Sequence, residues 1–245
     1  MLEADARDRI IVAIDCDRAR ALELADALAG HARWLKVGMT LFYAEGPAIV
    51  QAFTERGFKV FLDLKFHDIP HQVRGAARSA ALAGADLLSV HGSGGRAMLT
   101  ACREGAEAAS EVRGCRPELV AITVLTSMDQ EALAEVGVEV PVAEQAARLA
   151  RLAQAGGIDG VVCSPREAAA MRALLGVDAL IVTPGVRPAG AELGDQARVA
   201  TPAQAIEAGA SHIVIGRPVT GADDPVAAFE AVVEELRGVE TPSSR

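Results

Sequence analysis

The sequence predicts an α/β protein folded as a single (β/α)8 TIM barrel. Short β-branched segments alternate with Ala- and Leu-rich segments of helical periodicity along the whole chain. Eight such pairs can be counted in 245 residues, a usual length for one closed barrel. No linker or change of composition divides residues 1–245, so we expect one domain, with a short N-terminal lead at 1–9 and a polar C-terminal tail at 238–245. A doubly wound open sheet is the competing architecture.

Each expected strand is a short apolar run, and the third of them, which follows Gly57, contains Asp63. In order, the strands are expected at 10–15, 34–38, the segment around Asp63, 87–91, 119–125, 160–163, 180–183 and 212–216. The helices between and after them are expected at 18–29, 41–56, 70–83, 95–112, 129–136, 141–155, 165–175, 202–208 and 225–237. This alternation favours a parallel barrel in which every strand ends at the same face.

Composition restricts the class of protein. Apolar residues make up 51% of the chain and charged residues 23%, which allows a sizeable core. The formal net charge of −9 argues against nucleic acid or a membrane surface as a partner, so a phosphate ligand would need local basic groups. The cysteines lack CxxC or metal-ligand spacing, which indicates reduced thiols in a cytoplasmic protein. The N-terminus is unlike a signal peptide, and no apolar run reaches about 18 residues, so no membrane span is expected.

The segment Asp63-Leu-Lys-Phe-His-Asp-Ile-Pro70 carries three charged side chains, Asp63, Lys65 and Asp68, where the third strand ends. Side chains alternate along a strand, so Asp63 and Lys65 are expected on one face, and burying them is costly unless they are paired or used. Pro70 suits the first turn of a helix, which places Asp68 at or near a capping position. A purely structural interpretation, an ion pair followed by a helix cap, stays open at this point.

Further polar residues are expected at the same face of the barrel, where active sites of this fold lie. They are Asp15 after the first strand, Lys36 in the second, Ser89 and His91 in the fourth, Thr126 and Ser127 after the fifth, and Arg217 after the eighth. Four of the charged residues, Asp15, Lys36, Asp63 and Lys65, form an alternating acid–base set on three neighbouring strands. Such a set is poorly explained by stability alone, because buried ion networks seldom improve on apolar packing.

A phosphate site is predicted after the seventh and eighth strands, the usual phosphate-binding loops of such barrels. Gly216 allows a backbone N–H to approach an anion, and the Arg217 guanidinium can bind it with two donors. The long loop from Val186 to about Thr201 is interpreted as a lid. No GxGxxG or Walker pattern is present, and His67 and His71 are separated by Pro70, so we expect neither a dinucleotide nor a metal.

Seven segments together resemble the orotidine 5′-phosphate decarboxylase family of the bacterial type. They are Ile11-Val-Ala-Ile-Asp15, Leu35-Lys-Val-Gly38, Asp63-Leu-Lys-Phe-His-Asp-Ile-Pro70, Val124-Leu-Thr-Ser127, Thr183-Pro-Gly-Val-Arg-Pro188, Asp195-Gln196 and Ile215-Gly-Arg-Pro218. The resemblance runs in order from about residue 10 to 237. It implies decarboxylation of orotidine 5′-monophosphate to UMP, without a cofactor, in a homodimeric barrel.

The resemblance also implies roles for the charged residues. Lys65 would donate the proton to C6 as carbon dioxide leaves, and Asp63 would lie beside the substrate carboxylate. Lys36 and Asp15 would bind the ribose hydroxyls. Asp68 would reach the site of the neighbouring subunit. This agrees with the chemistry of the residues, because a lysine between two carboxylates stays protonated and can stabilise a carbanion that has no electron sink.

The remaining implied contacts concern binding. Ile69 would cross the dimer interface with Asp68, and Thr126 and Ser127 would meet the ribose and the pyrimidine. The phosphate would be held by Arg187, Gln196, Gly216 and Arg217. One departure from the family pattern is visible, since His71 and Gln72 follow Pro70 where members often have Asn-Thr, and the cross-dimer threonine contact is therefore in doubt.

Two alternatives stay open from the sequence. A magnesium-dependent sugar-phosphate decarboxylase or aldolase of the same superfamily shares the Asp-x-Lys-x-x-Asp pattern, but such enzymes resemble one another in having a glutamate where this chain has Lys36. A non-catalytic phosphate-binding barrel would not need the lysine–aspartate set, and here every member of it is present.

Overall fold

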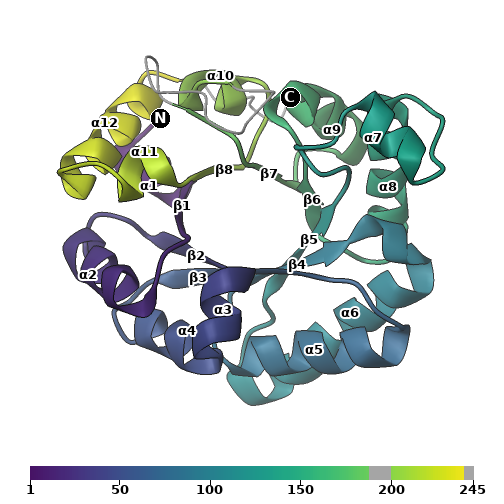
Figure 1. Ribbon diagram of the computed structural model, residues 1–245, viewed down its shortest axis with the longest axis horizontal. Helices are drawn as coiled ribbons and strands as arrows, with labels where there is room; N and C mark the ends of the chain where they lie inside the picture. The colour runs from purple at the N-terminus through teal and green to yellow at the C-terminus, as the bar shows by residue number, and fades with distance from the viewer. Residues whose placement is uncertain (188–199, 240–245) are drawn as a thin grey trace.

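The computed structural model describes residues 1–187 and 200–239, and its strands form a closed parallel barrel in the order β1 to β8, with the helices outside it (Figure 1). The predicted fold class is therefore confirmed, and the open-sheet alternative is wrong. The strands are β1 Ile10–Ile14, β2 Trp34–Gly38, β3 Lys59–Phe66, β4 Leu87–His91, β5 Glu118–Ile122, β6 Gly160–Val162, β7 Leu180–Thr183 and β8 His212–Ile215.

The helices that surround the barrel follow their strands closely in sequence. Before and after the first strands lie α1 Glu3–Asp8, α2 Arg18–Leu28, α3 Met39–Glu45, α4 Pro47–Thr54 and α5 Pro70–Leu82. The second part of the chain supplies α6 Gly95–Arg113, α7 Gln130–Glu135, α8 Val142–Ala155, α9 Ala168–Leu175, α10 Pro202–Glu207, α11 Arg217–Thr220 and α12 Pro225–Arg237. Short 3-10 turns, Gly92–Gly94 and Pro165–Glu167, precede α6 and α9.

Several boundaries differ from those expected. The helix expected at 41–56 is two helices, because Gly46 adopts a φ of +62° between α3 and α4 and Pro47 starts the second. β5 ends at Ile122 rather than at residue 125, and α1 and α11 were not expected. These are short elements, whose few residues carry little periodicity from which a prediction could be made.

The interior of the barrel is filled by side chains that alternate with those facing the helices. A buried interior cluster contains Ile11, Ala13, Trp34, Phe61, Leu87, Val120, Val182 and Val214. Intervening residues such as Val12, Leu35 and Leu88 pack outward against the helices. The ionisable residues Asp15, Lys36 and Asp63 lie two residues after Ala13, Trp34 and Phe61, respectively. Because side chains alternate along a strand, they face the interior of the barrel next to this apolar layer.

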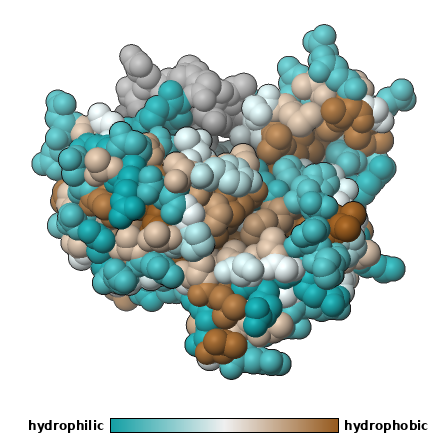
Figure 2. All heavy atoms as spheres, turned by 60° about the horizontal axis from the view of Figure 1, so that its bottom comes forward, coloured by the Kyte–Doolittle hydropathy of each residue, from teal (hydrophilic) through white to brown (hydrophobic). Residues whose placement is uncertain are grey.

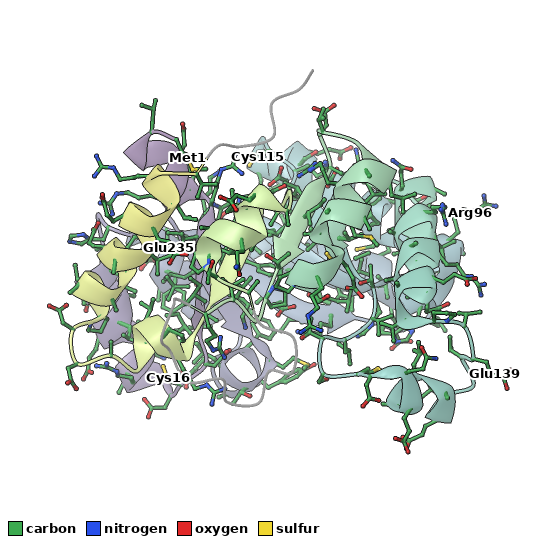
Figure 3. The ribbon with its side chains drawn as sticks, turned by 90° about the horizontal axis from the view of Figure 1, so that it is seen from above. Met1, Cys16, Arg96, Cys115, Glu139 and Glu235 are labelled. Carbon is green, nitrogen blue, oxygen red and sulfur yellow. The ribbon has the colours of Figure 1, made fainter. Side chains whose placement is uncertain are left out.

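The two ends of the barrel are distinguished in Figure 3. Cys16, which follows Asp15, lies at one end together with Glu139 of the α7–α8 connection, and Met1 and Cys115 lie at the opposite end. The strands therefore finish at the end marked by Cys16. On the face shown in Figure 2, hydrophilic side chains predominate and hydrophobic ones appear in separate patches. Within the described ranges, no helix combines the length and the apolar character needed to cross a bilayer.

Aromatic and basic side chains close the end where the strands begin. The His212 ring packs edge-on against Trp34, with ring centroids 5.8 Å apart, and the Lys59 ammonium lies 5.0 Å from the Trp34 ring. The Nδ1 atom of His212 is buried and has no hydrogen-bond partner in the described part of the chain. Burial, assisted by the positive charges of Arg9 and Lys59, lowers the pKa of His212 to about 4.

We expect His212 to make the protein less stable in mild acid. The unfolded chain takes up the proton near pH 6.5, whereas the folded ring resists it until about pH 4. The full stability is therefore present above pH 6.5 and falls as the pH is lowered towards 4, by about 3 kcal/mol from this residue. Urea unfolding at several pH values should show a shallower pH dependence for His212→Gln than for the wild type. Equal slopes, or a ring that titrates near pH 6.5 by NMR, would contradict this.

Candidate active site

A cavity of about 410 Å³ opens at the end of the barrel where the strands finish. Eight of the site residues predicted from the sequence line it: Asp15, Lys36, Asp63, Lys65, Thr126, Arg187, Gly216 and Arg217. Its volume lies in the range of pockets that enclose small-molecule ligands. The strands that carry these residues are far apart in sequence, so the barrel itself brings them together.

Four charged side chains form a continuous alternating chain across β1, β2 and β3. The Lys36 Nζ lies 3.1 Å from Asp15 Oδ1 and 3.8 Å from Asp63 Oδ2. The Lys65 Nζ donates a 2.8 Å hydrogen bond to the same Asp63 Oδ2. The side chains of Lys36 and Asp63 are only 11% and 13% exposed, so each needs its opposite charge as a partner.

Gly38 leaves the space that this chain of charges occupies. It pairs with Asp63 in the β2–β3 ladder. A Cβ atom at this position would lie 2.9 Å from Asp15 Oδ1 and 3.1 Å from Lys36 Nζ. A side chain at Gly38 would therefore displace the first ion pair, which explains why β2 ends on a residue without one.

The carboxylate of Asp63 is the most constrained group of the cavity. Burial opposes its ionisation, but Lys36, Lys65 and the hydroxyl of Ser89 together hold the pKa of Asp63 below its usual value of 3.8. Ser89, fully buried in β4, donates a 2.7 Å hydrogen bond to Asp63 Oδ1. Asp63 is therefore ionised at neutral pH, with both oxygens bonded.

The backbone of Lys65 is strained. Its φ is +54°, and among the described residues it is the only one other than glycine with a positive φ. The left-handed conformation costs a residue with a Cβ atom about 1–3 kcal/mol. The β3–β4 ladder is irregular here, since its register shifts between Leu62 and Phe66. Such local strain often marks a functional site, because the surrounding structure has to enforce it.

The opposite wall of the cavity is apolar. Ile122 and Val124 reach it from the end of β5, and Val162 from β6. A planar ring could lie against this wall with its polar edge towards the charged strands. The cavity is thus divided into a charged half on β1–β3 and an apolar half on β5–β6.

Two arginines stand at the remaining part of the rim. Arg187 follows β7, and its backbone N–H donates to the Ala200 carbonyl, which joins the two ends of the segment between them. Arg217 follows Gly216 directly after β8. Guanidinium groups on neighbouring loops suit a phosphate, as the sequence predicted. The predicted lid lies largely within 188–199, and Gln196, the fourth expected phosphate contact, is outside the described residues.

Three predicted residues do not line the cavity. Ser127 is exposed after β5, beside the lining residue Thr126. Asp68 is exposed, and Ile69 is 63% exposed. The N-cap of α5 is Ile69 rather than Asp68, whose carboxylate instead accepts a 2.6 Å hydrogen bond from the Ile69 N–H. Asp68 pairs with no cation in the part of the chain that the structure describes, so Lys65 has one carboxylate neighbour rather than the expected two.

The histidines near the cavity form no recognisable ligand set. The rings of His67 and His91 lie 5.1 Å apart at the ends of β3 and β4. Burial lowers the pKa of His91, and the positive charges of His67 and Lys65 contribute to the same shift. Among residues 1–187 and 200–239, no three His, Cys, Asp or Glu side chains converge as metal ligands would.

Comparisons with known proteins agree with this geometry. The model of the orotidine 5′-phosphate decarboxylase / HUMPS family matches residues 8–232. Orotidine 5′-phosphate decarboxylase from Moorella thermoacetica is 52% identical over 242 residues, covering 98% of this chain and 96% of the relative. The enzyme of that name from Alkalilimnicola ehrlichii is 53% identical over 232 residues, covering 94% and 97%. The crystal structure of the Lactobacillus acidophilus orotidine 5′-phosphate decarboxylase superposes with a TM-score of 0.84 at 39% identity, covering 94% and 99%.

We expect the ion pairs of Asp63 to stabilise the folded barrel. Asp63→Asn should lower the free energy of unfolding by about 3 kcal/mol at pH 7, because it leaves the buried ammonium group of Lys36 and the partly buried one of Lys65 without the carboxylate between them. The stabilisation by Asp63 is present above pH 3.8 and is lost as the pH falls through its lowered folded pKa, so the deficit should shrink in acid. Denaturant unfolding at pH 7 and at lower pH measures both effects.

Asp26→Asn is the matched control. Asp26 also pairs with a cation, Arg56, at 2.7 Å, but its side chain is 65% exposed. That substitution should change the free energy of unfolding by about 1 kcal/mol or less. Equal losses from both substitutions would show that burial of the Asp63 pair has no special weight.

Proposed function

Because the chain belongs to the orotidine 5′-phosphate decarboxylase / HUMPS family, we propose that it decarboxylates orotidine 5′-monophosphate to UMP and releases carbon dioxide. The observation that carries the proposal is the chain of charges Asp15–Lys36–Asp63–Lys65 that lines the cavity, with Lys36 and Asp63 largely buried. Relatives that carry this enzyme's name match nearly the full length of the chain at about half identity. The step belongs to the synthesis of pyrimidine nucleotides, and the proposal needs no metal or organic cofactor.

The proposed chemistry depends on charge placed before the substrate arrives. Loss of carbon dioxide from C6 leaves a carbanion that the ring cannot delocalise, so the transition state has to be stabilised electrostatically. Lys65 supplies a positive charge next to that carbon and then the proton that replaces the carboxylate. Asp63 accepts a 2.8 Å hydrogen bond from the ammonium group of Lys65 and so directs it.

Binding would use the rest of the cavity. Lys36 and Asp15, which are already paired, offer a donor and an acceptor to the ribose hydroxyls. Thr126, with Ser127 beside it, would meet the ribose and the pyrimidine amide. The phosphate would be bound by Gly216 and the guanidinium groups of Arg187 and Arg217, together with Gln196. Binding energy from the phosphate end can then offset the cost of placing the substrate carboxylate near Asp63.

The alternative functions fit the geometry less well. In a magnesium-dependent enzyme the carboxylates of the site would be available to the metal. Here the ammonium group of Lys36 lies between Asp15 and Asp63, and Lys65 pairs with Asp63 as well, so two lysines balance the two carboxylates. A barrel that only binds phosphate would not need a strained lysine held against a buried aspartate.

We propose further that the active form is a homodimer in which Asp68 and Ile69 enter the neighbouring subunit's site. The 63% exposure of Ile69, a large apolar side chain at the N-cap of α5, supports this. Within residues 1–187 and 200–239 of one chain, Asp63 is the carboxylate that pairs with Lys65, which leaves a place for the partner's carboxylate. The free thiols of all four cysteines support action in a reducing compartment such as the cytoplasm.

The function is tested by following the ultraviolet absorbance of orotidine 5′-monophosphate with purified protein in EDTA. We expect turnover by the wild type and a loss of about 10⁴-fold or more in Lys65→Ala, which removes both the proton donor and the positive charge. Lys59→Ala is the matched control, since Lys59 lies on the same strand at the opposite end of the barrel. It should retain turnover within about twofold, because it touches no part of the cavity.

A wild type that is inactive in EDTA and restored by magnesium would favour the metal-dependent alternative. Binding of UMP without any turnover would favour the phosphate-binding barrel. Substantial activity in Lys65→Ala would reject Lys65 as the proton source.

The shared site is tested with mixed dimers. When Lys65→Ala and Asp68→Ala chains are refolded or exchanged together, each heterodimer has one site with both residues intact, so about a quarter of wild-type activity should return. Mixing Lys65→Ala with the double variant Lys65→Ala/Asp68→Ala provides the control, since no intact site can form. Negligible activity in both mixtures would show that Asp68 acts within its own chain, and about half of wild-type activity in the first mixture, with Asp68→Ala alone fully active, would show that Asp68 has no role.

A further inference from the structure

Ser89 bridges the two residues to which the proposed chemistry gives most weight. It lies in the middle of β4 and is fully buried. Its Oγ donates to Asp63 Oδ1 at 2.7 Å and accepts from the backbone N–H of Lys65 at 2.9 Å. Neither direction can be reversed, because an ionised carboxylate only accepts and a backbone N–H only donates.

The irregular pairing of β3 with β4 explains why this hydroxyl is needed. Leu62 pairs with Leu88, and the next pair is Phe66 with Val90. Ser89 therefore lies opposite three residues of β3, and Lys65 is not paired with a β4 residue in the register of the two strands. The serine hydroxyl takes that place and secures a backbone whose φ of +54° is otherwise unfavourable.

The same hydroxyl determines how the Asp63 carboxylate is oriented. Oδ1 is bonded to Ser89, which leaves Oδ2 to face the Lys65 Nζ at 2.8 Å and the Lys36 Nζ at 3.8 Å. Ser89 is not among the residues that line the cavity. It fixes the catalytic lysine at its backbone and the partner aspartate at its side chain without meeting the substrate.

We propose that Ser89 is a positioning residue, which sets the direction of the Lys65 ammonium group towards the reacting carbon by tying the Lys65 backbone to the Asp63 carboxylate. This rests on the proposed decarboxylase function and adds a residue to it. A misplacement of a catalytic group by about 1 Å can cost about 100-fold in rate, so the effect should appear in kcat. KM should change little, because the phosphate and ribose contacts lie on other strands.

The test compares kcat, KM and the pH profile of three variants in the orotidine 5′-monophosphate assay. Ser89→Ala should lower kcat by about 10- to 100-fold with KM within about threefold of the wild type. Without the hydroxyl hydrogen bond the Asp63 carboxylate is less well stabilised, so the acid limb of kcat should move to higher pH. Ser89→Thr, which keeps the hydroxyl, should recover most of kcat and the original acid limb.

Thr123→Val is the matched control. Thr123 is buried beside the cavity, and its hydroxyl bonds only to the Val162 carbonyl, at 3.0 Å, in the described part of the chain. Its kcat and pH profile should stay as in the wild type, within about twofold. Circular dichroism and calorimetric binding of UMP establish for each variant that the barrel is folded and the cavity intact.

The outcomes separate this proposal from the function on which it rests. If the wild type and Ser89→Ala turn over substrate alike, with the same acid limb, the positioning role is rejected and the decarboxylase function stands. A fall in kcat accompanied by equal losses in UMP binding and folding would make Ser89 merely structural and would also reject the proposal. An inactive wild type would overturn both.

Discussion

The active-site architecture depends on one buried interaction, the carboxylate of Asp63 held between two lysines. A lone carboxylate could not stay ionised at this depth, and a lone lysine could not stay charged. Lys36 and Asp63 are the buried pair of this network, and Lys65 and the largely exposed Asp15 continue it at either end. This mutual dependence supplies a strong local field without any external ion, and it makes every member costly to remove.

The barrel meets this constraint by alternation. An apolar layer inside the barrel, which includes Trp34 and Phe61, excludes water from one side of the site. The charged groups lie two residues further along the chain from this layer. Gly38, which has no side chain, leaves the space that the Asp15–Lys36 ion pair occupies. The same regularity produces both the core and the site, so the charged residues need no loops to position them.

Much of this could be predicted from the sequence, because alternation within a strand and the end at which barrel sites lie are local or general rules. Asp63 and Lys65 were expected on one face, and they are paired. Regular strand alternation explains this pairing only in part. Lys65 has a positive φ where the pairing of β3 with β4 is irregular, and this tertiary effect cannot be read from the local sequence. The sequence predicts Ser89 only as one of the polar residues at the end of the barrel where the site lies. Its position two residues after the interior Leu87 was the signal that could have identified it. Asp68, which was expected at or near a capping position, lies one residue before Ile69, the N-cap of α5, and α5 begins at Pro70 as expected.

In the proposed reaction, the residues that bind the substrate and the residues that act on its carboxylate lie on different strands of the barrel. The guanidinium groups follow β7 and β8, the charged chain belongs to β1–β3, and the apolar wall comes from β5 and β6. A phosphate bound on one side does not reduce the repulsion between the substrate carboxylate and Asp63 on the other side. Its binding free energy can offset the energetic cost of that repulsion in the bound complex. As carbon dioxide leaves, that repulsion disappears while the attraction of Lys65 for the new carbanion grows. The fixed charges therefore favour the transition state over the bound substrate, and this difference is what accelerates the reaction.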